Sequence, residues 1–78
     1  MVSDKLKRII LAELSLDDFE IVDGTVASTV PGWDSLNHAQ IIAAVEDGFG
    51  VRFKTAEIMR LKNVGDLQAL LDQKAQGR

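Results

Sequence analysis

The chain has 78 residues, of which 46% are hydrophobic and 27% are charged, with a formal net charge of −3. This is the composition of one small folded domain over residues 1–78, and it argues against disorder. The chain contains no cysteine, which excludes disulfides and thiolate metal sites. Nucleic-acid binding is disfavoured as well, because it is typical of basic domains.

The first predicted helix follows Ser3, a favourable N-cap, and has Asp4 in its first turn. Its apolar residues recur at helical spacing: Leu6, Ile9, Ile10, Leu11 and Leu14. A loop from Ser15 to about Asp34 comes next, since its Asp-Gly, Ser-Thr and Pro-Gly pairs favour turns. A loop this long inside a compact domain is usually functional. We expect three apolar residues to tie it to the core: Phe19, Ile21 and Val22.

Three further helices are predicted: one from near Ser35 to Gly48–Gly50, a short one around Thr55–Leu61, and one after Asn63. Asn63 is a good N-cap, and Asp66 stands at the third helical position. The apolar face of this last helix comprises Val64, Leu67, Leu70 and Leu71. Strand alternation and internal repeats are absent from the sequence. The predicted fold class is therefore all-α, a small four-helix bundle with a long first loop and a short third helix.

The second helix has apolar residues on two sides. One side is an ordinary core stripe: Ile41, Ile42, Val45 and Phe49. The opposite side has a small apolar patch, which polar and acidic residues flank. We interpret this patch as a partner-docking surface, although exposed apolar residues on a helix are also common by themselves. Its apolar members are Leu36, Ala39 and Ala43, and its flanking residues are Gln40, Glu46 and Asp47.

Ser35 lies at the N-terminus of that second helix, directly after the long loop. Unpaired backbone N–H groups and the helix dipole favour an anion there, so a phosphodiester on Ser35 would be tolerated. The alternative is that Ser35 or Asp34 simply caps the helix.

Basic residues are concentrated between positions 51 and 62, a segment with four bases and a single acid, Glu57. The four are Arg52, Lys54, Arg60 and Lys62. By itself, this cluster is typical of the solvated flank of a helix.

The run GWDSLNHAQIIAAVEDGFGVRF, with VGDL further on, resembles the acyl carrier protein family. The family hallmark is D-S-L at the start of the second of four helices, which Asp34, Ser35 and Leu36 match. The acidic pair Glu46-Asp47 and then Phe49-Gly50 follow at the expected distance. The likeness covers nearly the whole chain, including its length and its long first loop.

The resemblance implies that a phosphopantetheinyl transferase attaches 4′-phosphopantetheine from coenzyme A to Ser35. The thiol of this arm carries acyl groups as thioesters between loading and transferring enzymes. Asp34 would assist the modification through the magnesium ion of the transferase, and Leu36 would contact partners. The protein itself would then be no enzyme.

The chain departs from the family pattern in two places. Fatty-acid-synthase carriers usually have acids at the positions of Asn37 and Gln40, and their third-helix region is acidic rather than basic. Because such carriers dock basic partners through charge, we expect a specialised carrier for a lipid, polyketide or surface-polymer pathway. Peptidyl carriers usually have the sequence G-G-[HD]-S-[LI] around the modified serine. This chain has Gly32-Trp33 in place of the two glycines. An aminoacyl cargo and an unmodified helical interaction module remain alternatives.

Catalytic and metal sites are not expected. Ser35, His38 and Asp34 include the groups of a hydrolytic triad, but His38 falls within the core stripe, far around the helix from Ser35. We expect His38 to be partly buried, beside a space that could shelter an acyl chain. Trp33 fits carriers outside the housekeeping group, and the alternative is that it anchors the loop to the core. The acids from Asp17 to Asp23 lack the spacing of a calcium loop.

The expected setting is the cytoplasm, without membrane insertion. No apolar run approaches the length of a membrane span, and the N-terminal segment lacks the cleavage site of a signal peptide. The small size of the apolar patch predicts a monomer. Met1 and the polar end KAQGR suggest a free-standing protein.

Overall fold

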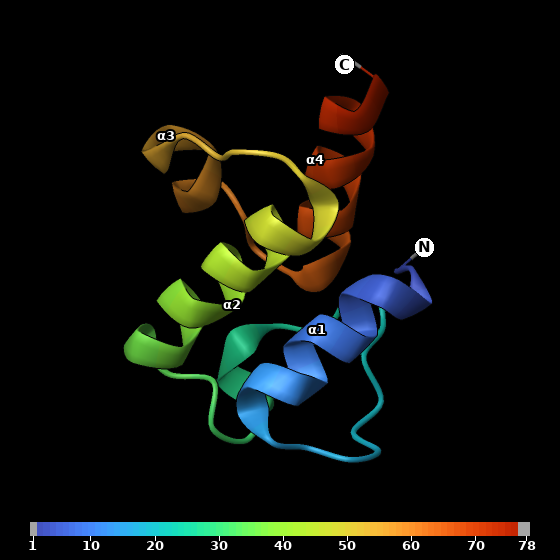
Figure 1. Cartoon of the computed structure of the whole chain (residues 1–78). Coiled ribbons are helices and arrows are strands. Elements are labelled where there is room, and N and C mark those ends of the chain that lie inside the picture. Colours follow the sequence, from blue (N-terminus) through green and yellow to red (C-terminus); the bar gives the residue numbers. More distant parts are fainter. Residues whose placement is uncertain (1, 77–78) are drawn as a thin grey trace.

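The computed structural model describes residues 2–76, and all regular secondary structure in that range is helical. The elements are α1 (Asp4–Leu14), the 3-10 helix η1 (Ala27–Thr29), α2 (Ser35–Phe49), α3 (Thr55–Met59) and α4 (Val64–Gln76). Figure 1 shows α2 crossing the middle of the molecule, with α1 and the long loop on one side and α3 on the other. The predicted all-α class and its four helices are confirmed. None of the helices in this range combines the length and hydropathy that a membrane span requires.

The helix starts follow from local capping bonds. Ser3 Oγ accepts a hydrogen bond from the backbone N–H of Leu6 at 3.2 Å, as predicted for the N-cap of α1. Asn63 Oδ1 accepts one from the backbone N–H of Asp66 at 2.8 Å, which confirms the predicted start of α4. The C-terminal end of α2 is also set locally, because its C-cap Gly50 adopts the left-handed conformation with φ 66°.

The core lies between α1, α2 and α4. Leu6, Ile10, Ile41 and Val45 are fully buried, and Leu67 and Leu71 of α4 pack against the same cluster. On α4 the predicted apolar face is partly wrong, because Leu70 is only half-buried whereas the polar Gln68 is buried. Gln68 can be buried because its amide is satisfied, accepting from the backbone N–H of Ser3 at 2.9 Å and donating to Asp72 at 2.8 Å.

The long loop is tied to the core through a different set of residues from the predicted one. Ile21 is buried and Phe19 packs against the core as expected, but Val22 is 49% exposed, so that prediction was wrong. The reason is a tight turn in which Thr25 Oγ1 accepts from the backbone N–H of Val22 at 2.9 Å. This turn directs Thr25 inward, and Val30 also becomes buried beyond the unpredicted helix η1.

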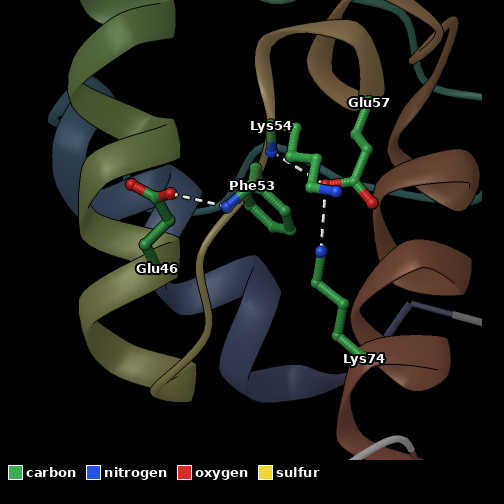
Figure 2. Close-up of polar contacts among 5 residues, drawn as sticks. All are labelled: Glu46, Phe53, Lys54, Glu57 and Lys74. Carbon is green, nitrogen blue, oxygen red and sulfur yellow. Dashed lines mark hydrogen bonds and ion pairs between the residues drawn. The ribbon is translucent and has the colours of Figure 1, made fainter.

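The third helix is shorter than predicted, ending at Met59 rather than Leu61. Figure 2 shows how it is attached on both sides. Glu46 of α2 accepts from the backbone N–H of Phe53 at 2.8 Å, just before α3. Glu57 of α3 accepts from the backbone N–H of Lys54 at 2.8 Å and forms an ion pair with Lys74 of α4 at 2.9 Å. These bonds compensate for the small apolar area that a helix of five residues can bury.

Candidate functional site

The N-terminus of α2 separates the roles of two adjacent residues. Asp34 is the N-cap, since its Oδ1 accepts from the backbone N–H of Asn37 at 2.8 Å. Ser35 is the first helical residue and is exposed. Within residues 2–76, no hydrogen bond engages the Ser35 hydroxyl. Capping therefore falls to Asp34, and the hydroxyl of Ser35 is available to other molecules.

The turn before α2 is fastened to the helix by Asn37. Asn37 Nδ2 donates to the carbonyl of Gly32 at 2.6 Å, and Gly32 itself adopts a positive φ of 81°. A carboxylate at position 37 could not make this bond, because an ionised acid has no donor. Asn37 is thus a structural residue of the site that the sequence did not reveal. The only available signal was that it replaces the acid usual at this position in fatty-acid-synthase carriers.

Trp33 and His38 form a pair that lines one surface depression together with Ser35. The prediction that His38 lies far around the helix from Ser35 was therefore wrong, because residues three apart share a helix face. Trp33 Nε1 donates to His38 Nδ1 at 3.0 Å, and the two rings stack with centroids 6.1 Å apart. His38 is half-buried, as predicted. Its Nδ1 accepts from Trp33, and the Oδ1 of Asp34 accepts from the helix backbone, so the bonds of a Ser-His-Asp relay are not made.

Two hollows adjoin this pair. The inner one is a small, mostly apolar cavity of about 50 Å³ between α2, the long loop and the start of α4, and it is partly open to solvent. The outer one is a shallow depression at the surface, and Ser35 lines it. The residues that line both are Ala27, Trp33 and His38.

The predicted docking residues divide into two groups. Leu36 is 69% exposed, and Ala39 is exposed as well. The other four line one surface groove, together with Glu13 of α1 and Arg52: Gln40, Ala43, Glu46 and Asp47. Of these, Glu46 is half-buried, and its Oε2 accepts the Phe53 N–H bond described above.

The basic cluster is exposed around α3. Arg52, Lys54, Arg60 and Lys62 all face solvent, and none has an ion pair in the part of the chain that the structure describes. Met59 is 80% exposed in their midst. The acid of this region, Glu57, is held by the backbone N–H of Lys54 and by Lys74, which together lower its pKa below the ordinary value of 4.5. The segment from residue 51 to residue 62 is therefore mostly basic where it is exposed, and it also exposes the apolar Met59.

Comparison with known proteins agrees with this arrangement. Residues 4–71 match the family model described as the phosphopantetheine attachment site. An acyl carrier protein of Streptococcus pyogenes serotype M1 is 34% identical over 74 residues, covering 95% of this chain and 96% of the streptococcal protein. Another, of Streptococcus thermophilus, is 36% identical over 73 residues, covering 94% and 95%.

A solved structure extends the likeness to the fold. The solution structure of a holo acyl carrier protein from Geobacter metallireducens has a TM-score of 0.88 and 34% identity, covering 94% of this chain and 84% of that one. The fold is thus that of a phosphopantetheine-bearing carrier. The chain belongs to the acyl carrier protein family: it bears a covalently attached 4′-phosphopantetheine arm and catalyses no reaction itself.

Proposed function

We propose that the arm is attached to Ser35 Oγ and that the protein serves a specialised pathway rather than a housekeeping fatty-acid synthase. One observation carries the attachment site: Asp34 satisfies the helix N-terminus, which leaves the exposed Ser35 hydroxyl without a hydrogen bond in residues 2–76. A hydroxyl that holds no structural role can be esterified without loss to the fold.

The residues around Ser35 fit the group. The first backbone N–H groups of α2 and its dipole favour the phosphodiester that joins the arm to the serine. The hydroxyl lies at an open depression, so a transferase can reach it. When bound, the arm supplies a thiol that holds acyl groups as thioesters. Asp34, adjacent in the chain, keeps a carboxylate at the same helix end, where it can assist the magnesium ion of the transferase.

The attachment is tested by intact mass. Incubation with a broad-specificity phosphopantetheinyl transferase, coenzyme A and magnesium should add one phosphopantetheinyl group to the wild-type chain and none to Ser35→Ala. The variant should stay folded, because Asp34 keeps the cap. If a folded wild-type chain gains no mass with several transferases, attachment is refuted. The chain would then act as an unmodified interaction module.

The specialised role rests on the surface charge. The exposed bases around Met59 would repel a partner with a basic docking patch, and like charges at an interface lower the association rate. An acidic partner patch suits this face better. The groove at Gln40, Ala43, Glu46 and Asp47, together with Leu36 and Ala39, provides the second part of the proposed docking surface.

Charge reversal tests that role. Turnover by a fatty-acid-synthase ketosynthase should be lower for this carrier than for an acidic housekeeping carrier, and Arg60→Glu/Lys62→Glu should raise it at low salt. The control Lys7→Glu/Arg8→Glu makes the same change in net charge on α1 and should have little effect. The gain should shrink in about 1 M salt, where charges are screened beyond roughly 3 Å. Equal turnover by both wild-type carriers would contradict a specialised role.

The cargo itself is proposed to be an acyl group, with an aminoacyl group as the second candidate. Acyl cargo is favoured because the curated relatives are acyl carrier proteins and because Gly32-Trp33 departs from the peptidyl-carrier pattern. Loading assays that offer acyl and aminoacyl adenylates to the holo protein distinguish the two.

A further inference from the structure

The Trp33–His38 pair stands between the attachment point and the interior of the bundle. Ser35 lines the outer depression, and Leu61, Val64 and Leu67 line the inner cavity. Trp33 and His38 line both. An acyl chain tethered at Ser35 would therefore have to pass these two rings to reach the inner cavity by this side.

The inner cavity is too small for a long chain. Its volume is about 50 Å³. An apolar cavity of about 150 Å³ holds benzene, which has six carbons, so the space here suits roughly two. Longer chains can enter only if the surrounding side chains move apart.

Two hydrogen bonds oppose that movement. One is the bond from Trp33 Nε1 to His38 Nδ1, which keeps the stacked rings together. The other runs from Asn37 Nδ2 to the Gly32 carbonyl and fastens the turn that bears Trp33 to α2. Parting the rings without moving the turn breaks the first bond, and moving the turn breaks both.

The first bond also depends on the charge of His38. Nδ1 can accept from the indole only while it carries no proton, because the indole nitrogen is solely a donor and a charged imidazole donates from both nitrogens. Protonation at Nδ1 would place two donors against each other. The charged residues that line the hollows with His38 are Lys62, before α4, and Asp34, at the cap of α2.

We infer that the Trp33–His38 pair is a gate, which excludes acyl chains of more than about two carbons from the bundle while His38 is neutral. The carrier then presents longer cargo at its surface, accessible to partner enzymes. This inference rests on the proposed attachment at Ser35, but the closure of the gate is a property of the unmodified chain and can be measured without the arm.

Two variants of His38 separate the hydrogen bond from mere bulk. His38→Leu removes the acceptor and retains an apolar side chain. His38→Asn is smaller but keeps an acceptor oxygen near the position of Nδ1. A gate that depends on the bond should fail in His38→Leu and be retained in His38→Asn, whereas a role in packing alone would not give that order.

The unmodified protein gives the first test. Exchange of the Trp33 indole proton with solvent, followed by NMR, should be slow in the wild type and about tenfold faster in His38→Leu, roughly the effect of losing one hydrogen bond. His38→Asn should stay near the wild-type rate. Equal rates in the wild type and His38→Leu would overturn the gate, whatever happens at Ser35.

The loaded protein gives the second test. A transferase and octanoyl-coenzyme A are used to load the arm, and intact mass verifies the product before any spectrum is recorded. NMR contacts from the octanoyl chain to the methyl groups of Val64 and Leu67 should be absent in the wild type at neutral pH and present in His38→Leu. His38→Asn should lack these contacts, as the wild type does.

The outcomes are distinct. Octanoyl contacts in the neutral wild-type protein, or none in His38→Leu, overturn the gate while leaving the attachment intact. A chain that gains no mass refutes attachment at Ser35 instead, and the indole exchange then decides whether the pair is closed.

Discussion

At the residue scale, Asp34 and Ser35 take different positions at one helix end. The Asp34 side chain bonds to the backbone of α2, whereas Ser35 is exposed and its hydroxyl has no hydrogen bond among residues 2–76. This separation means that the structural and chemical contributions of Asp34 can be measured independently, because asparagine caps a helix nearly as well as aspartate does.

Asp34→Asn should therefore change the free energy of unfolding by less than about 1 kcal/mol, with the lost charge at the helix N-terminus accounting for the difference. Asp34→Ala should lose about 1 kcal/mol, because the Asn37 N–H loses its partner. If the carboxylate assists modification, both variants should be phosphopantetheinylated more slowly, on the order of 10–100-fold. Urea unfolding and timed intact-mass measurements check this. A wild-type rate in Asp34→Asn would show that the charge is not needed.

At the scale of the element, α3 depends on polar bonds rather than on its own length. A five-residue helix is too short to be stable by itself, so its neighbours must hold it. Glu57 contributes twice, through the Lys54 backbone N–H and through Lys74 of α4. The basic cluster lies just before and just after α3. The bonds of Glu57 therefore also help to position the basic side chains that we propose to select partners.

The bonds of Glu57 make part of the stability depend on pH. Its pKa is lowered in the folded protein, mainly by the Lys54 backbone hydrogen bond and then by Lys74, so the contribution is present above the ordinary value of 4.5. It is lost as the pH falls through the lower folded-state pKa. Wild type should thus have a higher thermal midpoint than Glu57→Gln at pH 7, and the difference should vanish in strong acid. In a Lys74→Gln background, Glu57→Gln should still lower the thermal midpoint at pH 7, but by less. A midpoint difference between wild type and Glu57→Gln that persists unchanged in acid would contradict this explanation.

At the scale of the whole molecule, three distant segments meet at one polar junction. The Asp23 carboxylate accepts a hydrogen bond from the backbone N–H of Val2 at 2.9 Å. The backbone carbonyl of Asp23 accepts one from the backbone N–H of Gly65 at 2.8 Å. Next to it, the Thr25 carbonyl accepts from the backbone N–H of Val64 at 2.9 Å. The start of the chain, the long loop and the start of α4 are thereby joined, which holds the loop where it lines the inner cavity.

This junction requires a glycine at position 65. A Cβ there would lie 2.8 Å from the Asp23 carbonyl oxygen, a backbone atom that cannot move cheaply. Gly65→Ala should therefore destabilise the protein by about 1–3 kcal/mol, despite the better helix propensity of alanine. Gly48→Ala is the matched control, because its Cβ would meet only the end of the Ile9 side chain, at 2.9 Å, which can rotate. It should be neutral or stabilising by up to about 1 kcal/mol in urea unfolding. Equal losses in both would refute the junction as the cause.

What the sequence by itself determined are the features with local causes. The starts of α1 and α4 were predictable because the caps Ser3 and Asn63 bond to a residue three positions ahead, and the helix faces because apolar side chains repeat every turn. The family was recognisable for a similar reason: the D-S-L motif and its surroundings are contiguous in the chain.

Only the tertiary structure decided which side chains outside this periodicity are buried. Gln68 is buried because Ser3, 65 residues away, satisfies its oxygen, and Thr25 is buried beside the start of α4, while Val22 turns outward. It also determined that Asp34 rather than Ser35 is the cap, and that Trp33 closes onto His38. A loop has no repeating pattern from which side-chain direction can be read. The partner that satisfies a buried polar group there is set by how distant segments pack, which local sequence does not specify.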